Sequence, residues 1–453
     1  MTTAEPRQEA QLVQWLELAP KPPALQRGWH VFLSYRSVNR SWVLHLYDAL
    51  RSVGFDVFLD QLEIAAGDSL VSRLNNALEN SQTGVIVWST RYEDSEWCRA
   101  EYESMEALRR DKSRNFRFVV IKLKDAELPS LAAKDVYLDF SEYPSGPQGG
   151  ELLRLMYGLL GQAIPAPVLL AAQSIDDQTK LSLTRIRAAR SVGNAKALVD
   201  GAAQGGSAWQ ASPLLYCSTA EALIEIEKED AALSVLETAK QFEKAIRPIQ
   251  LRALAFARKA KRAMAAAQDD QRPAAERSHS RDQADSLIAD AQQMLAELYE
   301  LNHRDPETLG LYARTWMDRY ALTGSRIFLE KSRDLYAHAF GLHPTDYYTG
   351  INAAAKSVLL DELTQGAELA KRVELIVGAQ PVPGDYWKCA TVAEAQLIQS
   401  AFDRAAELYR KAVSDAPTAT GNHASTLTQA ERLMAHLKPP EAQRQKILSA
   451  LRI

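Results

Sequence analysis

The pattern of apolar residues changes once along this chain, and that change constrains the fold more than any other feature. From Gly28 to about residue 162, short apolar runs alternate with helical stretches in βα order. The runs VIVW at 85–88 and FVVI at 118–121 are apolar throughout, as in parallel strands whose two faces are both covered by helices. We therefore predict an α/β domain over residues 28–162, with a doubly wound parallel sheet of about five strands.

The second half lacks strand signals. From residue 175 onward, Ala, Leu, Glu, Lys, Arg and Gln recur at helical spacing to the end. The segment DYY at 346–348 recurs as DYW at 385–387, and LYAHAF ending at 340 recurs as LYRKAV ending at 413. A period in the upper thirties is typical of stacked helical hairpins. We therefore predict an all-α helical-repeat solenoid over residues 175–453.

Breaks in these patterns mark the predicted boundaries. The Pro- and Gly-rich segment at 143–150 precedes one last helix of the α/β domain. Residues 163–174 follow that helix and are assigned as a linker, although their sequence also permits a helix. Residues 1–27 form an N-terminal extension whose packing the sequence leaves open. The polar stretch at 265–285 predicts an exposed loop.

Charge and composition disfavour several classes of function. With 53 Lys and Arg against 57 Asp and Glu, the chain has no strong positive field, so nucleic acid is not an expected partner. The three cysteines are far apart and the eight histidines show no H-x-x-x-H spacing, so we predict no metal site. No stretch reaches the ~18 apolar residues of a membrane helix, and no signal peptide is evident. We predict a cytoplasmic protein without membrane association.

Polar and aromatic residues follow the predicted strands, at the edge where open α/β sheets bind ligands. The first strand, HVFLSYRS, ends on Tyr35 and Arg36, and the run VFLD ends on Asp60. The later segment SEWCRAE begins a helix in which Trp97 and Glu101 are four residues apart, and therefore share a face. No G-x-G-x-x-G or P-loop motif accompanies these residues, which disfavours hydride transfer and NTP hydrolysis.

These motifs resemble the TIR domain family. The resemblance is carried by FLSYRS at 32–37, the loop from FLD to Gly67 at 58–67, and SEWCRAE at 95–101, and it covers roughly residues 28–162. It implies a flavodoxin-like sheet. TIR domains serve either as signalling adaptors or as enzymes that cleave NAD⁺, so the resemblance implies NAD⁺ as a substrate with no cofactor.

In the enzymes of this family, the Glu of the W-C-x-x-E segment is catalytic, and Glu101 occupies that position. The resemblance further implies that Trp97 borders the nicotinamide pocket, that Tyr35 and Arg36 contact the dinucleotide, and that Asp60 lies in a loop that shapes the site. One carboxylate is chemically sufficient, because nicotinamide departs neutral from a cationic pyridinium and needs no general acid. Water would then give ADP-ribose, and an internal adenine nitrogen would give a cyclic isomer.

Each of these residues also has a purely structural interpretation. Glu101 fits a solvated carboxylate near a helix start, and Trp97 and Tyr35 fit core aromatics. Arg36 and Asp60 fit a structural ion pair. The sequence alone does not separate these interpretations from a role in catalysis or binding.

The helical half resembles a degenerate tetratricopeptide (TPR) array, most closely the TRAFs-binding domain. Such solenoids self-associate or bind a protein partner, which implies a sensing or oligomerisation module. The aromatic residues at 347, 348, 386 and 387 are either groove anchors or core residues. The combination resembles bacterial antiviral effectors that deplete NAD⁺ when clustered. Two alternatives remain open, a non-enzymatic TIR scaffold and a cyclase that produces a cyclic ADP-ribose signal.

Overall fold

The structure is a computed structural model that describes residues 4–25, 28–59, 70–90, 92, 95–123, 126–128, 137–147, 149–301, 305–379, 385–417 and 420–452. The chain forms two compact units, Met1–Lys259 and Ala260–Ile453. Helix α12 (Ile246–Gln268) runs through the division between them. No described helix combines the length and the apolar character that a membrane crossing requires.

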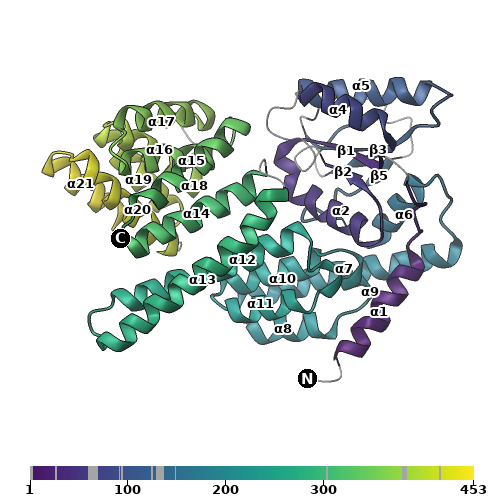
Figure 1. The fold of residues 1–453 in the computed structure, drawn as a ribbon, viewed down its shortest axis with the longest axis horizontal. Helices are drawn as coiled ribbons and strands as arrows, with labels where there is room; N and C mark the ends of the chain where they lie inside the picture. The colour runs from purple at the N-terminus through teal and green to yellow at the C-terminus, as the bar shows by residue number, and fades with distance from the viewer. Residues whose placement is uncertain are drawn as a thin grey trace. The chain divides into compact units, whose positions relative to one another are not determined.

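A five-stranded parallel sheet forms the N-terminal part of the first unit (Figure 1). Its spatial order is β2-β1-β3-β4-β5, with all neighbours parallel. This confirms the predicted doubly wound, flavodoxin-like sheet, and the strand order reverses between β1 and β3. The strands are β1 (Trp29–Tyr35), β2 (Val57–Phe58), β3 (Ser81–Trp88), β4 (Arg117–Lys122) and β5 (Tyr137–Asp139).

Helices cover both faces of this sheet (Figure 1). Helices α4 (Leu70–Glu79) and α5 (Glu96–Arg110) lie on one face, and α2 (Arg40–Ser52) and α6 (Gly149–Leu159) lie on the other. Phe32, Ile86 and Val120 belong to one buried cluster with Met105 of α5. Because side chains alternate along a strand, the residues between them face α2 and α6, which explains why the central strands are apolar throughout.

The N-terminal extension packs against the rest of the first unit. It forms helix α1 (Ala4–Leu18), in which Trp15 is fully buried. The Tyr157 hydroxyl donates to the Leu18 carbonyl at 3.2 Å, and the backbone amide of Gly206 donates to Gln11 Oε1 at 2.8 Å. The sequence left the packing of this extension open. In the structure, it forms hydrogen bonds with α6 and with the helices that follow α6.

The first unit also contains helices α7 to α11, the start of α12 and the short 3-10 helices η1 (Ser37–Asn39) and η4 (Lys240–Phe242). The predicted linker differs from the structure, because residues from Ala166 onward are helical. Pro165 is the N-cap of α7 and a second proline lies in its first turn, where proline is well tolerated. The helices are α7 (Ala166–Ser191), α8 (Ala195–Gln204), α9 (Ser207–Ala211), α10 (Leu214–Glu225) and α11 (Glu229–Glu237).

Buried polar groups join α2 to the start of α12. Asp48 is only 4% exposed, and its two carboxylate oxygens accept hydrogen bonds from the backbone amides of Ile246 at 3.2 Å and Arg247 at 3.4 Å. Asp48 therefore satisfies amides that begin a helix distant in sequence. Burial raises the pKa of Asp48 to about 7. Burial, followed by the charge of Arg247, lowers the pKa of His45 to about 3.

We expect Asp48→Asn to make the first unit more sensitive to acid. The stability that neutral His45 contributes is present above its unfolded pKa of 6.5 and is lost as the pH falls toward 3. Asp48 acts in the opposite direction, because its contribution is present below its unfolded pKa of 3.8 and is lost as the pH rises through 7. The two effects offset each other between pH 7 and pH 5. Without Asp48, the unfolding free energy should fall by about 2 kcal/mol more over this interval.

Urea unfolding of wild type and Asp48→Asn at pH 7 and pH 5 measures this difference. The control is Asp177→Asn, an exposed position on α7. The same pH dependence in all three proteins would contradict the expectation.

The second unit consists of helices that pack in consecutive pairs, and it confirms the predicted repeats. The two Asp residues of the repeated DYY and DYW segments are the N-caps of α16 and α18: Asp346 accepts from the Tyr348 amide at 3.1 Å and Asp385 from the Lys388 amide at 3.1 Å. Equivalent side chains therefore start equivalent helices. The helices after α12 are α13 (Ala274–Leu301), α14 (Pro306–Thr323), α15 (Arg326–Leu342), α16 (Tyr347–Leu359), α17 (Leu363–Val377), α18 (Tyr386–Ile398), α19 (Phe402–Asp415), α20 (Thr420–Leu437) and α21 (Glu441–Leu451).

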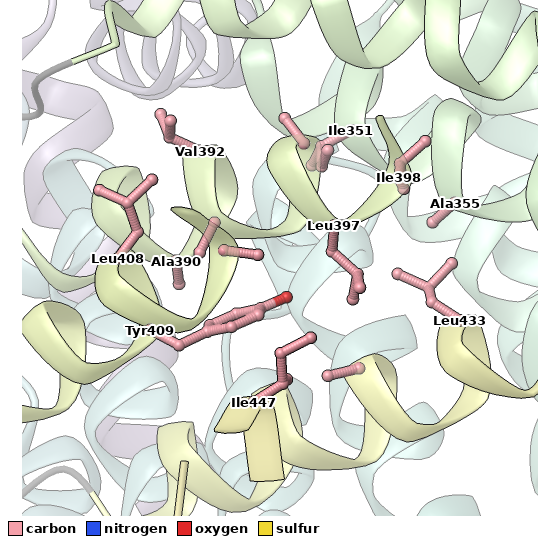
Figure 2. Packing of buried hydrophobic residues seen from close by; sticks show 14 of the residues in the cluster. Ile351, Ala355, Ala390, Val392, Leu397, Ile398, Leu408, Tyr409, Leu433 and Ile447 are labelled. Atoms are coloured by element: carbon pink, nitrogen blue, oxygen red, sulfur yellow. The ribbon is translucent and has the colours of Figure 1, made fainter. Parts of the chain in front are cut away.

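Apolar side chains from successive repeats share one core. Figure 2 shows Leu397 of α18 and Leu433 of α20 beside Tyr409 of α19 and Ile447 of α21. Each helix pair hides its apolar face against the next, as a solenoid requires.

Two smaller predictions about the helical half need correction or refinement. Within the stretch at 265–285, only residues 269–273 form an exposed loop, because α12 extends to Gln268 and α13 begins at Ala274. Its Ala, Gln, Glu and Arg residues favour helix although they are polar. The repeat aromatics divide between the two interpretations: Tyr386 is buried in the core, whereas Trp387 is 52% exposed and Tyr348 49% exposed.

Candidate functional site

The candidate site lies where the strand order reverses. Ser34 and Tyr35 end β1, and Tyr92 follows β3. In the sheet, Ser34 is level with Ile86 and Tyr35 with Val87. Open α/β sheets bind ligands in the crevice at the carboxyl ends of strands on either side of such a reversal, so these residues stand at the position that the topology favours.

Helix α5 brings Glu101 to this edge. Ser95 is its N-cap, and its hydroxyl accepts from the Cys98 amide at 3.3 Å. Glu101 is half-buried on α5. Its Oε2 accepts a hydrogen bond from the Ser34 hydroxyl at 2.5 Å. The carboxylate is therefore held against the end of β1 by a hydrogen bond to an ionised group, which is stronger than one between neutral partners.

A second hydrogen bond extends this contact into the core. Ser34 Oγ is 2.6 Å from the Tyr92 hydroxyl, and both residues are 1% exposed. Ser34 has one hydroxyl hydrogen, which is directed at Glu101, so the hydroxyl hydrogen of Tyr92 is shared between Ser34 Oγ and the Cys98 carbonyl oxygen, which lies 3.2 Å from the Tyr92 hydroxyl. Burial, and next the charge of Glu101, raises the pKa of Tyr92 well above its ordinary value. The phenol therefore stays protonated, and the chain runs from Tyr92 through Ser34 to Glu101.

The surrounding residues fix the inner end of this chain. The Trp88 ring stacks on Tyr92 with centroids 4.6 Å apart, and its indole Nε1 donates to the Glu127 carbonyl at 2.9 Å. Cys98 is buried, and its thiol donates to the Tyr35 carbonyl at 3.6 Å. Cys98 therefore packs as a small apolar residue. Tyr92 is thus held on one side by an aromatic ring and cannot easily rotate away from Ser34.

The predicted site residues are only partly described. Glu101 and Tyr35 meet at the same edge of the sheet, and Arg36 directly follows β1; Tyr35 and Arg36 are both half-buried. Asp60 lies outside the described residues, as does the side chain of Trp97. The ligand contacts expected of Tyr35, Arg36, Asp60 and Trp97 therefore stay predictions.

Sequence reasoning missed Ser34 and Tyr92 as members of the site. The available signal was weak: Ser34 is a polar residue at the end of an apolar strand. Tyr92 lies 58 residues away in sequence, and nothing in its local sequence indicates that it reaches β1.

A cavity beside the edge strand β5 does not coincide with this site. It has a volume of about 570 Å³ and is lined by residues of β5 and α6, among them Asp139, Glu151 and Arg154. Glu151 and Arg154 pair with each other at 3.5 Å. None of the predicted site residues is among the residues that line this cavity.

Comparison with known proteins gives two family matches. Residues 31–153 match the TIR domain family, and residues 228–360 match the family described as Tetratricopeptide Repeats-Sensor. The first match contains Ser34, Tyr92 and Glu101. The second includes helices of both compact units.

Individual relatives match the N-terminal part of the chain. It is 32% identical over 140 residues to the probable 2' cyclic ADP-D-ribose synthase BdTIR of Brachypodium distachyon, covering 30% of this chain and 62% of that protein. It is 29% identical over 86 residues to the 2' cyclic ADP-D-ribose synthase BtTIR of Bacteroides thetaiotaomicron, covering 19% of this chain and 30% of that protein. The chain thus spans less than two thirds of the length of these relatives.

Among solved structures, a thermophilic TPR protein of Thermus thermophilus aligns with 47% of this chain and 96% of its own, at 15% identity and a TM-score of 0.35. Because this likeness is low, the assignment of the repeats rests on the order of the helices and on the family match.

Proposed function

We propose that this chain, which contains a TIR domain followed by a TPR-like sensor domain, breaks the nicotinamide–ribose bond of NAD⁺. The observation that carries the proposal is the Glu101 carboxylate, held by Ser34 at the ligand-binding edge between β1 and β3. The names of the TIR relatives support it. Cyclic ADP-ribose is NAD⁺ without its nicotinamide, so a synthase of that product must break the same bond.

The proposed mechanism relies on one carboxylate. As the glycosidic bond breaks, its electron pair moves to the pyridinium nitrogen, and nicotinamide departs neutral. The positive charge that develops on the ribose is stabilised by Glu101, whose ionised form is held in place by Ser34. Attack by water then gives ADP-ribose and a proton. Tyr35 and Arg36, at the end of β1, would contact the dinucleotide, with Asp60 and Trp97 completing the pocket.

A cyclic product is the second candidate, and the relatives' names favour it. In that reaction, a nucleophile within the same molecule replaces water. The 2' in those names points to a ribose hydroxyl as the attacking group, instead of the adenine nitrogen expected from sequence. The hydrolytic and cyclising reactions share the first bond cleavage and differ only in the acceptor.

The helical half would control this activity. We propose that clustering through the repeats, in response to a protein trigger, activates cleavage, and that the chain acts as a bacterial antiviral effector. Support comes from the stacked helix pairs of the second unit, an architecture that presents an extended surface for self-association or partner binding. A dispersed chain should then be nearly inactive.

The test is NAD⁺ consumption by the full chain, alone and clustered by a bivalent antibody against a C-terminal tag, with products identified by mass spectrometry. Release of nicotinamide with ADP-ribose supports the hydrolase. Release with a cyclic isomer supports the cyclase. If the clustered chain leaves NAD⁺ intact, the proposal is wrong and the TIR domain is an assembly scaffold.

A further inference from the structure

Five charged side chains from four helices of the second unit gather on the inner helices of the repeats. Each helix is the first of its pair, and the residues are Arg314 and Asp318 of α14, Lys356 of α16, Glu394 of α18 and Arg432 of α20. Asp318 and Lys356 each interact electrostatically with Arg314 and Arg432. Charges that are far apart in the sequence therefore meet in one place, which we call the charged cluster.

The cluster is not a set of mutually neutralising ion pairs. The surrounding cations act on Asp318 across space, and its buried Oδ2 has no hydrogen-bond partner among the described residues. Lys356 is only 5% exposed, and its Nζ donates to Asn352 at 2.7 Å and lies 5.2 Å from the centre of the Tyr336 ring. A buried carboxylate oxygen without a donor is costly for folding. Its retention in the midst of cations is typical of a site that binds a ligand.

The balance of groups indicates the chemistry of that ligand. Three cations and two carboxylates leave the cluster positive, and Lys261 of α12 adds a fourth cation that acts on Asp318. Burial raises the pKa of Asp318 and of Glu394, and burial lowers the pKa of Lys356 to about 8. Guanidinium and ammonium groups suit a phosphate. The carboxylates suit hydroxyl groups that donate, so the arrangement matches a molecule that carries both.

The position of α20 favours a small ligand over a peptide. The Tyr386 hydroxyl and Thr426 Oγ1 are 2.8 Å apart, and Gln429 Nε2 donates to Glu394 Oε1 at 3.0 Å. Helix α20 therefore packs across the inner helices α16 and α18 and takes up space that an extended peptide along the groove would need.

We propose that the charged cluster is a binding site for a phosphorylated sugar, with Arg314 and Lys356 on the phosphate and Asp318 on the sugar hydroxyls. Arg432, exposed at the rim, would add a second contact to the phosphate. This site is distinct from the TIR chemistry and gives the repeats a small-molecule ligand.

The test is isothermal titration calorimetry with ribose 5-phosphate on the full chain carrying Glu101→Gln, so that the outcome does not depend on NAD⁺ cleavage. Arg314→Gln, Lys356→Met and Arg432→Gln should each weaken binding at least about tenfold, because each removes a charge-assisted contact. Lys371→Met, an exposed position on α17, should leave affinity unchanged. Met replaces a buried Lys with an uncharged side chain of similar volume, and Arg432 is exposed. Loss of folding therefore cannot account for weaker binding in all three cluster variants.

Three comparison probes make the result decisive. Ribose lacks the phosphate and inorganic phosphate lacks the hydroxyls, so each should bind at least about tenfold more weakly than ribose 5-phosphate. The tripeptide Ala-Ala-Asp offers free carboxylates and should not bind. The proposal is overturned if ribose 5-phosphate does not bind, if its affinity is unchanged in the cluster variants, if inorganic phosphate binds equally well, or if only the tripeptide binds.

Discussion

Glu101→Gln should reduce nicotinamide release from NAD⁺ on the order of 1000-fold under clustering conditions, because it removes the negative charge that stabilises the developing cation. The amide has the same shape, and its oxygen can still accept from Ser34 Oγ. The fold and the substrate affinity should therefore change little. Burst and steady-state assays with NAD⁺ separate a fall in kcat from a rise in KM, and the fall should lie in kcat.

The matched control for this variant is Glu103→Gln. Glu103 lies on the same helix but is exposed, so its replacement removes the same charge from α5 without touching the site. It should retain activity close to that of wild type. If the two variants lose activity equally, the loss comes from the change in the charge of α5 and not from removal of a catalytic carboxylate. That result would support the structural interpretation of Glu101.

The parts of this molecule that the sequence predicted have local, repeated signals. The central strands were recognisable because burial on both faces requires unbroken apolar runs such as Val85-Ile86-Val87. The repeats were recognisable because Asp346 and Asp385 perform the same capping function at the same point of two helices. In both cases the residues that determine an element lie within it.

The parts that were missed depend on contacts between distant segments. Pro165 indicates a break in a sequence, yet it is the N-cap of a long helix because α7 packs against α6, where the Gly150 amide donates to Asp176 Oδ1 at 2.7 Å. Most of the stretch that begins at Ala265 is polar because it lies on helices with exposed faces, and only residues 269–273 form a loop. The capping of α12 by Asp48 is likewise invisible until the chain has folded.

In the candidate site too, a local motif predicted one residue, whereas the others depend on contacts between distant segments. Glu101 was predicted from a short motif, which places it on the correct face of a helix but says nothing about what orients it. Its orientation comes from Ser34, and that of Ser34 comes in turn from Tyr92. This hydrogen-bond chain joins three segments, and such a chain has no sequence signature.

The hydrogen-bond chain leads to the second large expected effect. Ser34→Ala should lower kcat by roughly 10- to 100-fold, because a hydrogen bond to a charged group contributes about 1.5–3 kcal/mol. Tyr92→Phe should cost less, about 3- to 10-fold, since Ser34 still donates to Glu101 in that variant. The control is Ser104→Ala on α5, whose hydroxyl donates only to its own helix at the Ala100 carbonyl, 2.7 Å away.

The double variant distinguishes a positioning role from a general loss of packing. Tyr92 acts on Glu101 through Ser34 and also donates to the Cys98 carbonyl of α5, so Tyr92→Phe should cost less activity when added to Ser34→Ala than it costs alone. In Ser34→Ala, the acidic side of the pH–rate profile should also move to higher pH, because the ionised carboxylate has lost a donor. Additive losses together with an unchanged profile would mean that Ser34 and Tyr92 serve the core of the sheet rather than Glu101.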